Sequence, residues 1–286
     1  MPAILAATVA EVRAALADFR RRGQLVGLVP TMGALHAGHA ALIERARREC
    51  GCMAVSIFVN PIQFDRREDY EAYAIRLPDD VALCESLGTD VIFAPAAEEM
   101  YPAPQSVFVE VAGLTDHLCG RFRPGHFRGV ATVVAKLFHI VAPHRAYFGE
   151  KDAQQLAVIQ RMVADLNMPV EIVPVATVRD PDGLAVSSRN RRLSPEERRA
   201  APALFQALQA AAQAVASGAR SAAEAKAAAL AVLEACPEIR VEYLEVVDPA
   251  TMAPVEQISG PVRIAAAVWL GATRLIDNLY CPAVAR

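Results

Sequence analysis

Short apolar runs alternate with amphipathic stretches through the first two thirds of the chain. Continuous apolar runs of strand length are typical of parallel strands buried on both faces, and they lie at residues 25–29, 53–59, 91–93, 145–148 and 170–175. Residues with helical periodicity lie between them, at 8–22, 37–50, 130–141 and 152–167. The repeated order of strand and helix predicts an α/β fold with a Rossmann-like parallel sheet, with residues 107–111 as an edge strand.

The pattern changes near residue 178. Two alanine-rich helices are predicted at 195–216 and 222–236, and strand-like runs follow at 239–247 and 262–270. Because the order is helix, helix, strand, strand, it predicts an α+β arrangement and not a further βαβ unit. We therefore expect two domains, a Rossmann-like domain over residues 1–178 and a smaller C-terminal α+β domain over 179–286.

The composition narrows the class of protein. Hydrophobic residues make up 54% of the chain and charged residues 21%, as expected of a protein with a well-filled core. The net charge of −3 argues against non-specific binding of nucleic acid. No apolar run is long enough to span a bilayer and the N-terminus lacks a basic start, so we expect no membrane partner and a cytoplasmic location. We interpret the six scattered cysteines as reduced, buried residues without a function.

The loop after the first buried strand carries the strongest chemical signal. We expect Pro30 to end that strand, since proline has no N–H for the ladder. The loop contains Gly33, His36, Gly38 and His39 and leads into a predicted helix. The first turn of a helix attracts phosphate, and imidazoles three residues apart share a face of that turn. The pair is therefore suited to stabilise charge on a transferred phosphate. An ordinary polar loop and a zinc site without acidic or cysteine ligands are the alternatives.

Two further segments carry groups that suit phosphate. In the turn 149–152, Lys151 could contact phosphate and Asp152 a ribose hydroxyl, although both are also common helix caps. Residues 187–190 supply two hydroxyls and a guanidinium, with plain solvent exposure as the alternative. The basic segment 120–129 either supplies charge to phosphates or is only solvated, and the sequence leaves both open.

Neutral amides and carboxylates complete the set of candidates. Gln63 and Gln155 each follow a predicted strand end, and their amides suit a substrate with hydroxyl and carboxylate oxygens. Asp79 and Asp80 fall in the first turn of a helix that begins at Pro78. We interpret the two carboxylates as compensation of the helix dipole, with a metal role as the weaker alternative.

Several of these strings together resemble one known family. The run His-x-Gly-His resembles the nucleotidylyltransferase superfamily, and it is not specific when taken alone. Five strings in the same order resemble the pantothenate synthetase family, and they lie at residues 30–39, 58–64, 123–130, 148–155 and 182–190. Val186 departs from that family's pattern as an apolar exchange, and residues 73–77 depart from its usual Tyr-Pro-Arg-Thr.

The resemblance implies an ATP-dependent condensation of (R)-pantoate with β-alanine, through a pantoyl-adenylate, that releases AMP and diphosphate. It also implies Mg²⁺ and a homodimer. Because residues 187–189 lie at the junction of the two predicted domains, we also expect the C-terminal domain to close over ATP as a lid. The ATP-binding residues that carry over are Met32, Gly33, Ala34, Leu35, His36, Ala37, Gly38, His39, Gly149, Glu150, Lys151, Asp152, Val178, Val186, Ser187, Ser188 and Arg189.

Roles in catalysis and in substrate binding carry over in the same way. The residues implied to act on the reacting phosphates are His36, His39, Lys151, Ser187, Ser188 and Arg189, with His39 as proton donor. Gln63 and Gln155 match pantoate-binding glutamines, and Gln63 also lies beside the β-alanine position, whereas no metal ligand is assigned. The alternatives are a nucleotidylyltransferase that moves AMP onto a phosphorylated acceptor and an ATP-binding module without chemistry.

Overall fold

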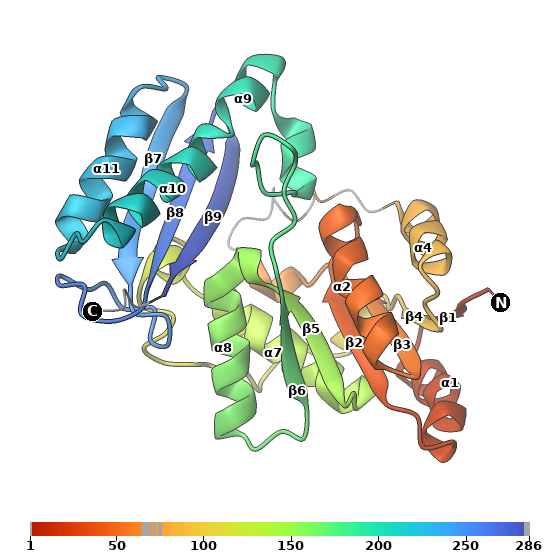
Figure 1. Cartoon of the computed structure of the whole chain (residues 1–286). Helices are drawn as coiled ribbons and strands as arrows, with labels where there is room; N and C mark the ends of the chain where they lie inside the picture. The colour runs from red at the N-terminus through yellow and green to blue at the C-terminus, as the bar shows by residue number, and fades with distance from the viewer. Residues whose placement is uncertain (1, 65–69, 71–72, 74–75, 283–286) are drawn as a thin grey trace. The chain divides into compact units, whose positions relative to one another are not determined.

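The computed structural model describes residues 2–64, 70, 73 and 76–282 (Figure 1). Contacts between residues divide the chain into two compact units. The N-terminal unit consists of Met1–Val111, Arg123–Glu150 and Val158–Ala176, and the C-terminal unit of Ala112–Phe122, Lys151–Ala157 and Thr177–Arg286. The sequence places one boundary after residue 178, whereas these contacts also group two earlier segments with the C-terminal residues. The departure from the family pattern at residues 73–77 falls partly outside the described residues.

The N-terminal unit is built on a parallel sheet of six strands in the order β1-β4-β3-β2-β5-β6. Its strands are β1 (Ile4–Ala6), β2 (Val26–Thr31), β3 (Cys52–Ile57), β4 (Val91–Phe93), β5 (Arg145–Gly149) and β6 (Glu171–Val175). The Rossmann-like α/β prediction is therefore confirmed, although the short strand β1 was not predicted. In such a sheet the carboxyl ends of neighbouring strands meet at one edge, where ligands bind.

Helices cover both faces of this sheet. They are α1 (Val9–Arg21), α2 (Ala37–Glu49), α4 (Leu77–Ser86), α5 (Ala97–Met100) and α7 (His126–Val141), with the 3₁₀ turn η1 (Pro61–Gln63). α2 packs on the central strands and against α4, while α1 packs against α7, and Figure 1 shows α2 in front of the sheet and α7 behind it. A capping box of Thr8 and Glu11 starts α1, which agrees with the helical segment predicted from residue 8.

β2 continues through Pro30, so the prediction that Pro30 ends this strand is wrong. The carbonyl of Thr31 accepts a hydrogen bond from the Phe58 N–H at 3.0 Å, on the β3 side. Because successive residues of a strand direct their backbone groups to alternate sides, the nitrogen of Pro30 faces β5. The pairing of β2 with β5 covers only Gly27 and Leu28, so the missing N–H breaks no ladder bond.

The edge strand predicted at residues 107–111 is also wrong, because these described residues form no strand. β1 and β6 already occupy the two edges of the sheet. Val109 instead donates its N–H to Oγ1 of Thr132 at 2.9 Å. The guanidinium of Arg128 lies 4.8 Å from the centre of the Phe108 ring, so α7 holds this segment through side chains.

The C-terminal unit packs two helices on an antiparallel sheet of order β7-β8-β9, which confirms the predicted α+β class. Its elements include η2 (Glu150–Asp152), the first residues of α8 (Ala153–Asp165), α6 (Leu118–Phe122), η3 (Ser188–Arg192), α9 (Pro195–Ala200), α10 (Ala203–Ala216), α11 (Ala222–Glu234), β7 (Ile239–Val247), β8 (Val262–Leu270) and β9 (Thr273–Cys281). The prediction of a single helix over 195–216 is wrong, because the helix is interrupted at Pro202, which lacks an N–H. β9 was not predicted.

All six cysteines are free thiols, and all are buried except the half-buried Cys236. Burial raises the pKa of Cys52 to about 12, which keeps that thiol protonated. The prediction of reduced, mostly buried cysteines is therefore confirmed. Among the described residues, no helix combines the length and the apolar character needed to cross a bilayer.

Candidate functional site

The segment from Met32 to His39, here called the histidine loop, joins the end of β2 to the start of α2. His36 is the N-cap of α2, and its Nδ1 accepts a 3.1 Å hydrogen bond from the N–H of Gly38. The N–H of His36 in turn donates to Nδ1 of His39 at 3.3 Å. The two ring centres are only 4.1 Å apart, so the predicted pairing of the imidazoles on one helical turn is confirmed.

These contacts fix which ring nitrogen carries the proton. Nδ1 of His36 and Nδ1 of His39 both accept from backbone N–H groups, so each neutral ring carries its proton on Nε2. An Nε2–H group donates hydrogen bonds and suits the oxygens of a phosphate, as do the N–H groups at the start of α2. The caps therefore set the tautomer that phosphate binding requires.

Gly38 leaves room for the first of these rings. A Cβ at this position would lie 2.9 Å from Cε1 of His36, closer than side chains tolerate. Gly33 and Ala34 precede it with φ values of 80° and 51°, in the left-handed region. The loop thus turns sharply before it reaches His36.

Gln63, the predicted pantoate ligand in this unit, is held from several sides. Its Oε1 accepts from Nδ2 of Asn60 at 3.0 Å, and its Nε2 lies 2.9 Å from Sδ of Met32. Nδ2 of Asn60 also donates to the carbonyl of Gly129 at 3.1 Å. Oδ1 of Asn60 accepts from the Tyr101 hydroxyl at 2.7 Å. The structure thereby brings Gln63 next to Met32, the first residue of the histidine loop.

The basic segment 120–129 supports Gln63 with its backbone and with a histidine. It is not one loop, since α6 ends at Phe122 and α7 starts at His126. Nδ1 of His126 donates to the Gln63 carbonyl at 2.8 Å, and its Nε2 then accepts from Arg123 at 3.2 Å. Within this unit His126 therefore positions η1, so plain solvation does not describe this residue. A supply of charge to phosphates by the arginines of the segment stays a prediction.

Gly149 belongs to the same edge of the N-terminal sheet. It ends β5, which is the neighbour of β2, and β2 is in turn the neighbour of β3. The histidine loop and Gln63 therefore follow the carboxyl ends of two strands, and Gly149 forms the carboxyl end of a third strand adjacent to them. Glu150 continues from Gly149 as the last residue of this part of the unit.

The remaining predicted residues belong to the C-terminal unit, where hydrogen bonds within that unit bring them together. Val186 donates its N–H to the carbonyl of Val178 at 2.9 Å, so these two predicted ATP residues lie side by side. Ser187 caps η3, with its Oγ accepting from the N–H of Arg189 at 3.3 Å. Asn190 donates to the carbonyl of Ala185 at 3.1 Å, which closes the turn from the other side.

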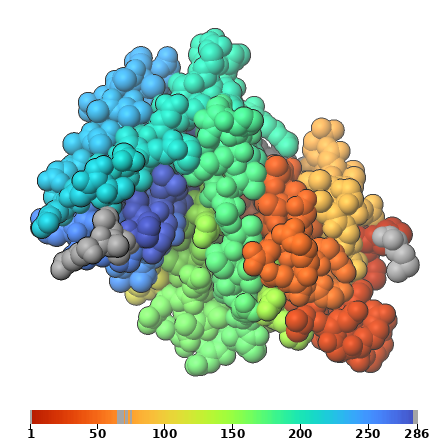
Figure 2. Space-filling view, in the orientation of Figure 1, coloured from red at the N-terminus to blue at the C-terminus, as the bar shows by residue number. Residues whose placement is uncertain are grey.

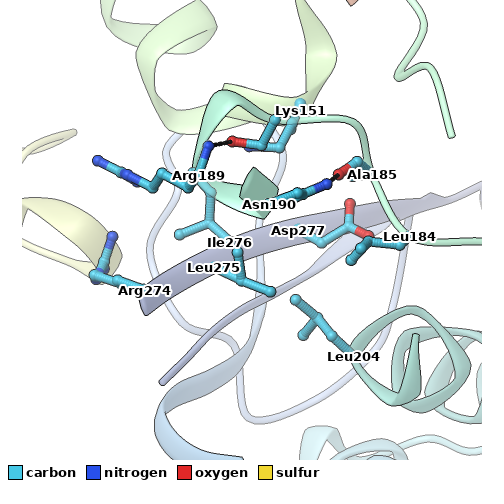
Figure 3. A pocket seen from close by; sticks show the side chains of 11 residues that line it. Lys151, Leu184, Ala185, Arg189, Asn190, Leu204, Arg274, Leu275, Ile276 and Asp277 are labelled. Carbon is cyan, nitrogen blue, oxygen red and sulfur yellow. Dashed lines mark hydrogen bonds between the residues drawn. The ribbon is translucent and has the colours of Figure 1, made fainter. Parts of the chain in front are cut away.

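A narrow pocket collects several of these residues (Figure 3). It is lined by Lys151, Leu184, Ala185, Ser187, Arg189, Asn190, Leu204, Arg274, Leu275, Ile276 and Asp277. Figure 3 shows the side chains of Arg189 and Arg274 extending toward the same side of it. Lys151, Ser187 and Arg189 thus line one pocket, and these two cationic side chains and the hydroxyl are of the kind that suits phosphate oxygens.

Residues of β9 hold this pocket together. Nδ2 of Asn278 donates to the carbonyl of Lys151 at 3.0 Å. Asp277 is only 3% exposed and accepts two hydrogen bonds from Arg179, at 2.5 and 3.0 Å. Arg179 also lies over the ring of Phe205, 3.7 Å from its centre. Because β9 was not predicted, none of these supporting contacts could be predicted either.

The two neighbouring glutamines of the first α8 turn are used differently. Gln154 is buried and donates to the carbonyls of Leu114 and His117, at 2.8 and 2.7 Å. Gln155, the predicted pantoate ligand, is half-buried. Gln154 therefore fixes the segment 112–122 to the start of α8, and Gln155 is the one with a side chain partly accessible to a ligand.

Asn60, Tyr101, His126, Asp277 and Asn278 are the functional-site residues that sequence reasoning missed. Asn278 acts on a predicted residue from a distant part of the chain, since its Nδ2 donates to the carbonyl of Lys151. Tyr101 acts indirectly, through Asn60 on Gln63. The only available signals were the place of Asn60 at a strand end and of His126 inside a family-like string.

Comparisons with known proteins agree with this arrangement. A family model described as Pantoate-beta-alanine ligase matches residues 4–280. The chain is 52% identical to the pantothenate synthetase of Moorella thermoacetica, over 95% of this chain and 96% of that protein. The crystal structure of pantothenate synthetase from Thermus thermophilus matches with a TM-score of 0.91 and 52% identity, covering 96% of this chain and 98% of that one.

A third match contains ligands. The pantoate-beta-alanine ligase of Francisella tularensis, complexed with beta-gamma ATP and beta-alanine, is 33% identical, with a TM-score of 0.80 and 97% coverage of both chains. The parallel sheet and the paired imidazoles at a helix N-terminus define a nucleotide-binding α/β enzyme. With these matches, the chain belongs to the pantoate–β-alanine ligase family and is a ligase. The resemblance stated from the sequence is confirmed.

Proposed function

We propose that this chain joins (R)-pantoate to β-alanine with ATP, through a pantoyl-adenylate, and releases AMP and diphosphate. The observation that carries the proposal is the pair of imidazoles at the start of α2, in a chain that matches the family over residues 4–280. Support for the substrates comes from the Francisella tularensis relative, whose structure is complexed with beta-gamma ATP and beta-alanine.

The reaction divides into two displacements. In the first, the carboxylate of pantoate attacks the α-phosphorus of ATP, and diphosphate leaves. We assign His36, His39, Lys151, Ser187, Ser188 and Arg189 to the phosphate oxygens, where hydrogen bonds and positive charge stabilise the developing negative charge. In the second, the neutral amine of β-alanine attacks the acyl carbon and AMP leaves. No enzyme side chain needs to form a covalent bond.

Gln63 and Gln155 are assigned to pantoate, and Gln63 also to the β-alanine position. Gln63 supports this role because Asn60 occupies its Oε1, which directs its amide nitrogen away from Asn60. An amide nitrogen donates to hydroxyl or carboxylate oxygens without placing a charge beside the attacking carboxylate. The other ATP residues named from the sequence contribute chiefly backbone groups in this proposal.

Mg²⁺ accompanies ATP in the proposal. Among the described residues, no group of three His, Cys, Asp or Glu side chains is arranged to hold a metal ion. In the proposal the ion takes most of its ligands from phosphate oxygens and water. When bound, such an ion supplies positive charge to the phosphates.

The protein also acts as a homodimer in this proposal. The side chains of Val107 and Phe108 are 74% and 41% exposed, in a segment with alternating apolar residues. Exposed apolar residues that lie together favour contact with another chain. Sedimentation of the parent and of Val107→Lys tests this, with a monomeric parent as the contradicting result. The cytoplasmic location and the lid role of residues 179–286 stay predictions.

Release of AMP and diphosphate tests the function. The protein is incubated with ATP and pantoate, with and without β-alanine. We expect one diphosphate per enzyme without β-alanine, since the adenylate stays bound, and steady release of diphosphate and AMP with it. Diphosphate release that requires a phosphorylated acceptor would favour a nucleotidylyltransferase, and ATP binding without any release would favour a non-catalytic module.

A further inference from the structure

Asp80 is a buried carboxylate that contacts the histidine loop and has no role in the reaction described above. It is 4% exposed, and it lies in the first turn of α4. Its Oδ2 accepts from the N–H of Ala34 at 2.9 Å, and its Oδ1 accepts from the N–H of Leu35 at 2.7 Å. We propose that Asp80 is a positioning residue that holds the histidine loop in the conformation needed for the first displacement, an inference that rests on the proposed function.

The contact from Asp80 lies at Ala34, where the backbone conformation of the histidine loop is least favourable. Ala34 has a φ of 51°, in the left-handed region that residues with a Cβ rarely adopt. A non-glycine residue persists there when neighbouring contacts require it. Two charge-assisted hydrogen bonds to consecutive N–H groups satisfy that condition, because the turn at Ala34 directs both N–H groups at one carboxylate.

The turn at Ala34 determines where His36 lies. Leu35 is 6% exposed and packs in the core between the sheet and α2, so it cannot shift without disturbing that core. His36 follows directly, in an extended conformation with a φ of −149°, and caps α2. Through Ala34 and Leu35, Asp80 therefore sets the direction from which the His36 ring enters.

The neighbouring carboxylate has a different environment, although the sequence gives both the same interpretation. Asp79 has a side chain that is 60% exposed, and it pairs with Arg76 at 3.0 Å. α4 lies against α2, as Figure 2 also shows on the surface of the N-terminal unit, and this packing directs Asp80 inward. Asp79 therefore fits the interpretation as compensation of the helix dipole, whereas Asp80 binds the backbone N–H groups of the histidine loop.

The chemistry requires a carboxylate. Both oxygens of Asp80 accept, so two N–H donors are satisfied at once. An asparagine offers one acceptor and one donor, so its NH₂ would face one of the two backbone N–H groups. Asp80→Asn thus keeps the size of the side chain and removes half of the contact, while Asp79→Asn is the matched control one residue away.

The experiment compares the parent, Asp79→Asn and Asp80→Asn for pantoate-dependent ATP–diphosphate exchange and for the KM values of ATP and pantoate. We expect Asp80→Asn to slow exchange by roughly 10- to 100-fold, as for a small displacement of reacting groups, and to change the KM of pantoate less than twofold. Asp79→Asn should match the parent. Exchange by Asp80→Asn within twofold of the parent would overturn the proposal.

A second variant separates positioning from folding. Glycine adopts a φ of about 51° without strain. The double variant Asp80→Asn with Ala34→Gly should therefore catalyse ATP–diphosphate exchange at least threefold faster than Asp80→Asn alone. No recovery, or loss of folding in both variants, would make Asp80 a fold residue and overturn the proposal. Amide hydrogen exchange of residues 32–39 should accelerate in Asp80→Asn, and unchanged protection there would also overturn it. A parent without pantoate-dependent exchange would instead reject the proposed function.

Discussion

The side-chain amide of Asn60 donates a 3.0 Å hydrogen bond to Oε1 of Gln63. The orientation of the Asn60 amide is fixed in turn by Tyr101, whose hydroxyl donates to Oδ1 of Asn60 at 2.7 Å. Burial raises the pKa of the Tyr101 phenol, so the hydroxyl stays protonated and remains a donor at neutral pH. Tyr101 thereby fixes the Gln63 amide with its oxygen on Asn60 and its nitrogen toward Met32. In the proposed function this nitrogen is the group that contacts pantoate.

Removal of that hydroxyl should weaken pantoate binding selectively. In Tyr101→Phe the Asn60 amide loses the bond that fixes it, and one such hydrogen bond contributes about 1 kcal/mol, or about fivefold in affinity. We expect the dissociation constant of pantoate to rise by about that factor in calorimetry, with ATP affinity unchanged. Tyr280→Phe, at an exposed tyrosine, is the control. Equal losses for pantoate and ATP would show that Tyr101 supports the fold only.

Gly129 should be the least replaceable glycine near Gln63. A Cβ at this position would lie 2.4 Å from the carbonyl oxygen of Ile62 and 2.6 Å from Cα of Gln63. Overpacking of this kind costs about 1–3 kcal/mol, or several degrees in Tm. We expect Gly129→Ala to lower Tm and to impair pantoate binding together, whereas Gly260→Ala, where the added Cβ meets open space, should do neither. A Gly129→Ala protein with the parent's Tm would contradict the close contact.

The sequence predicted the features that depend on local pattern. Strands β2 to β6 and the helices predicted with them have continuous or periodic apolar residues. The histidine loop is identified by its histidine pair and its glycines between a predicted strand and a predicted helix. Pro30 was misassigned because the effect of a missing N–H depends on which neighbour that side of the strand faces. Residues 107–111 have the pattern of a strand, but Val109 and Phe108 contact side chains of α7 and the segment pairs with no strand of the described sheet.

The residues that support the site could not be predicted for a related reason. Asp80 acts on Ala34 across 46 positions, and Tyr101 acts on Asn60 across 41. Such contacts are set by how α4 and the segment after β4 pack in the folded chain, which no local pattern encodes. An acidic residue in a first helical turn is typical of dipole compensation, so Asp79 and Asp80 are indistinguishable until their surroundings are known.

The ion pair between Glu242 and Arg274 should make stability depend on pH. Burial opposes ionisation of Glu242, but hydrogen bonds from Arg274 and Trp269 outweigh it and hold its pKa below the ordinary range. A lowered carboxyl pKa gives stability that is complete above the unfolded-state pKa, about 4.3, and is lost as pH falls through the lower folded-state pKa. Glu242→Gln should therefore have a lower Tm than the parent at pH 7, with the difference shrinking below about pH 4.3.

Glu256→Gln, at an exposed glutamate, is the control for that series. Its Tm should follow that of the parent at every pH. A Glu242→Gln difference that stays constant from pH 7 to pH 3 would mean that packing around Glu242, and not its charge, stabilises the sheet of the C-terminal unit.

His39 has two tasks on two different atoms, and two substitutions should separate them. Its Nδ1 accepts from the His36 N–H, while its Nε2 carries the proton assigned to phosphate. Asparagine places an acceptor near the position of Nδ1 and has no group near Nε2, whereas glutamine reaches the position of Nε2 with an N–H donor. We expect His39→Asn to keep the parent's Tm and to slow adenylate formation by roughly 10²- to 10⁴-fold.

His39→Gln should show the opposite combination, because it keeps a donor toward phosphate and loses the acceptor for the His36 N–H. Loss of such a cap costs about 1 kcal/mol, so its Tm should fall by a few degrees while adenylate formation stays faster than in His39→Asn. His139→Asn, on the exposed side of α7, controls for the loss of an imidazole elsewhere. If both His39 variants lost the same fraction of activity and of stability, the capping contact and the donor would act as one, and the assignment of separate roles to Nδ1 and Nε2 would be wrong.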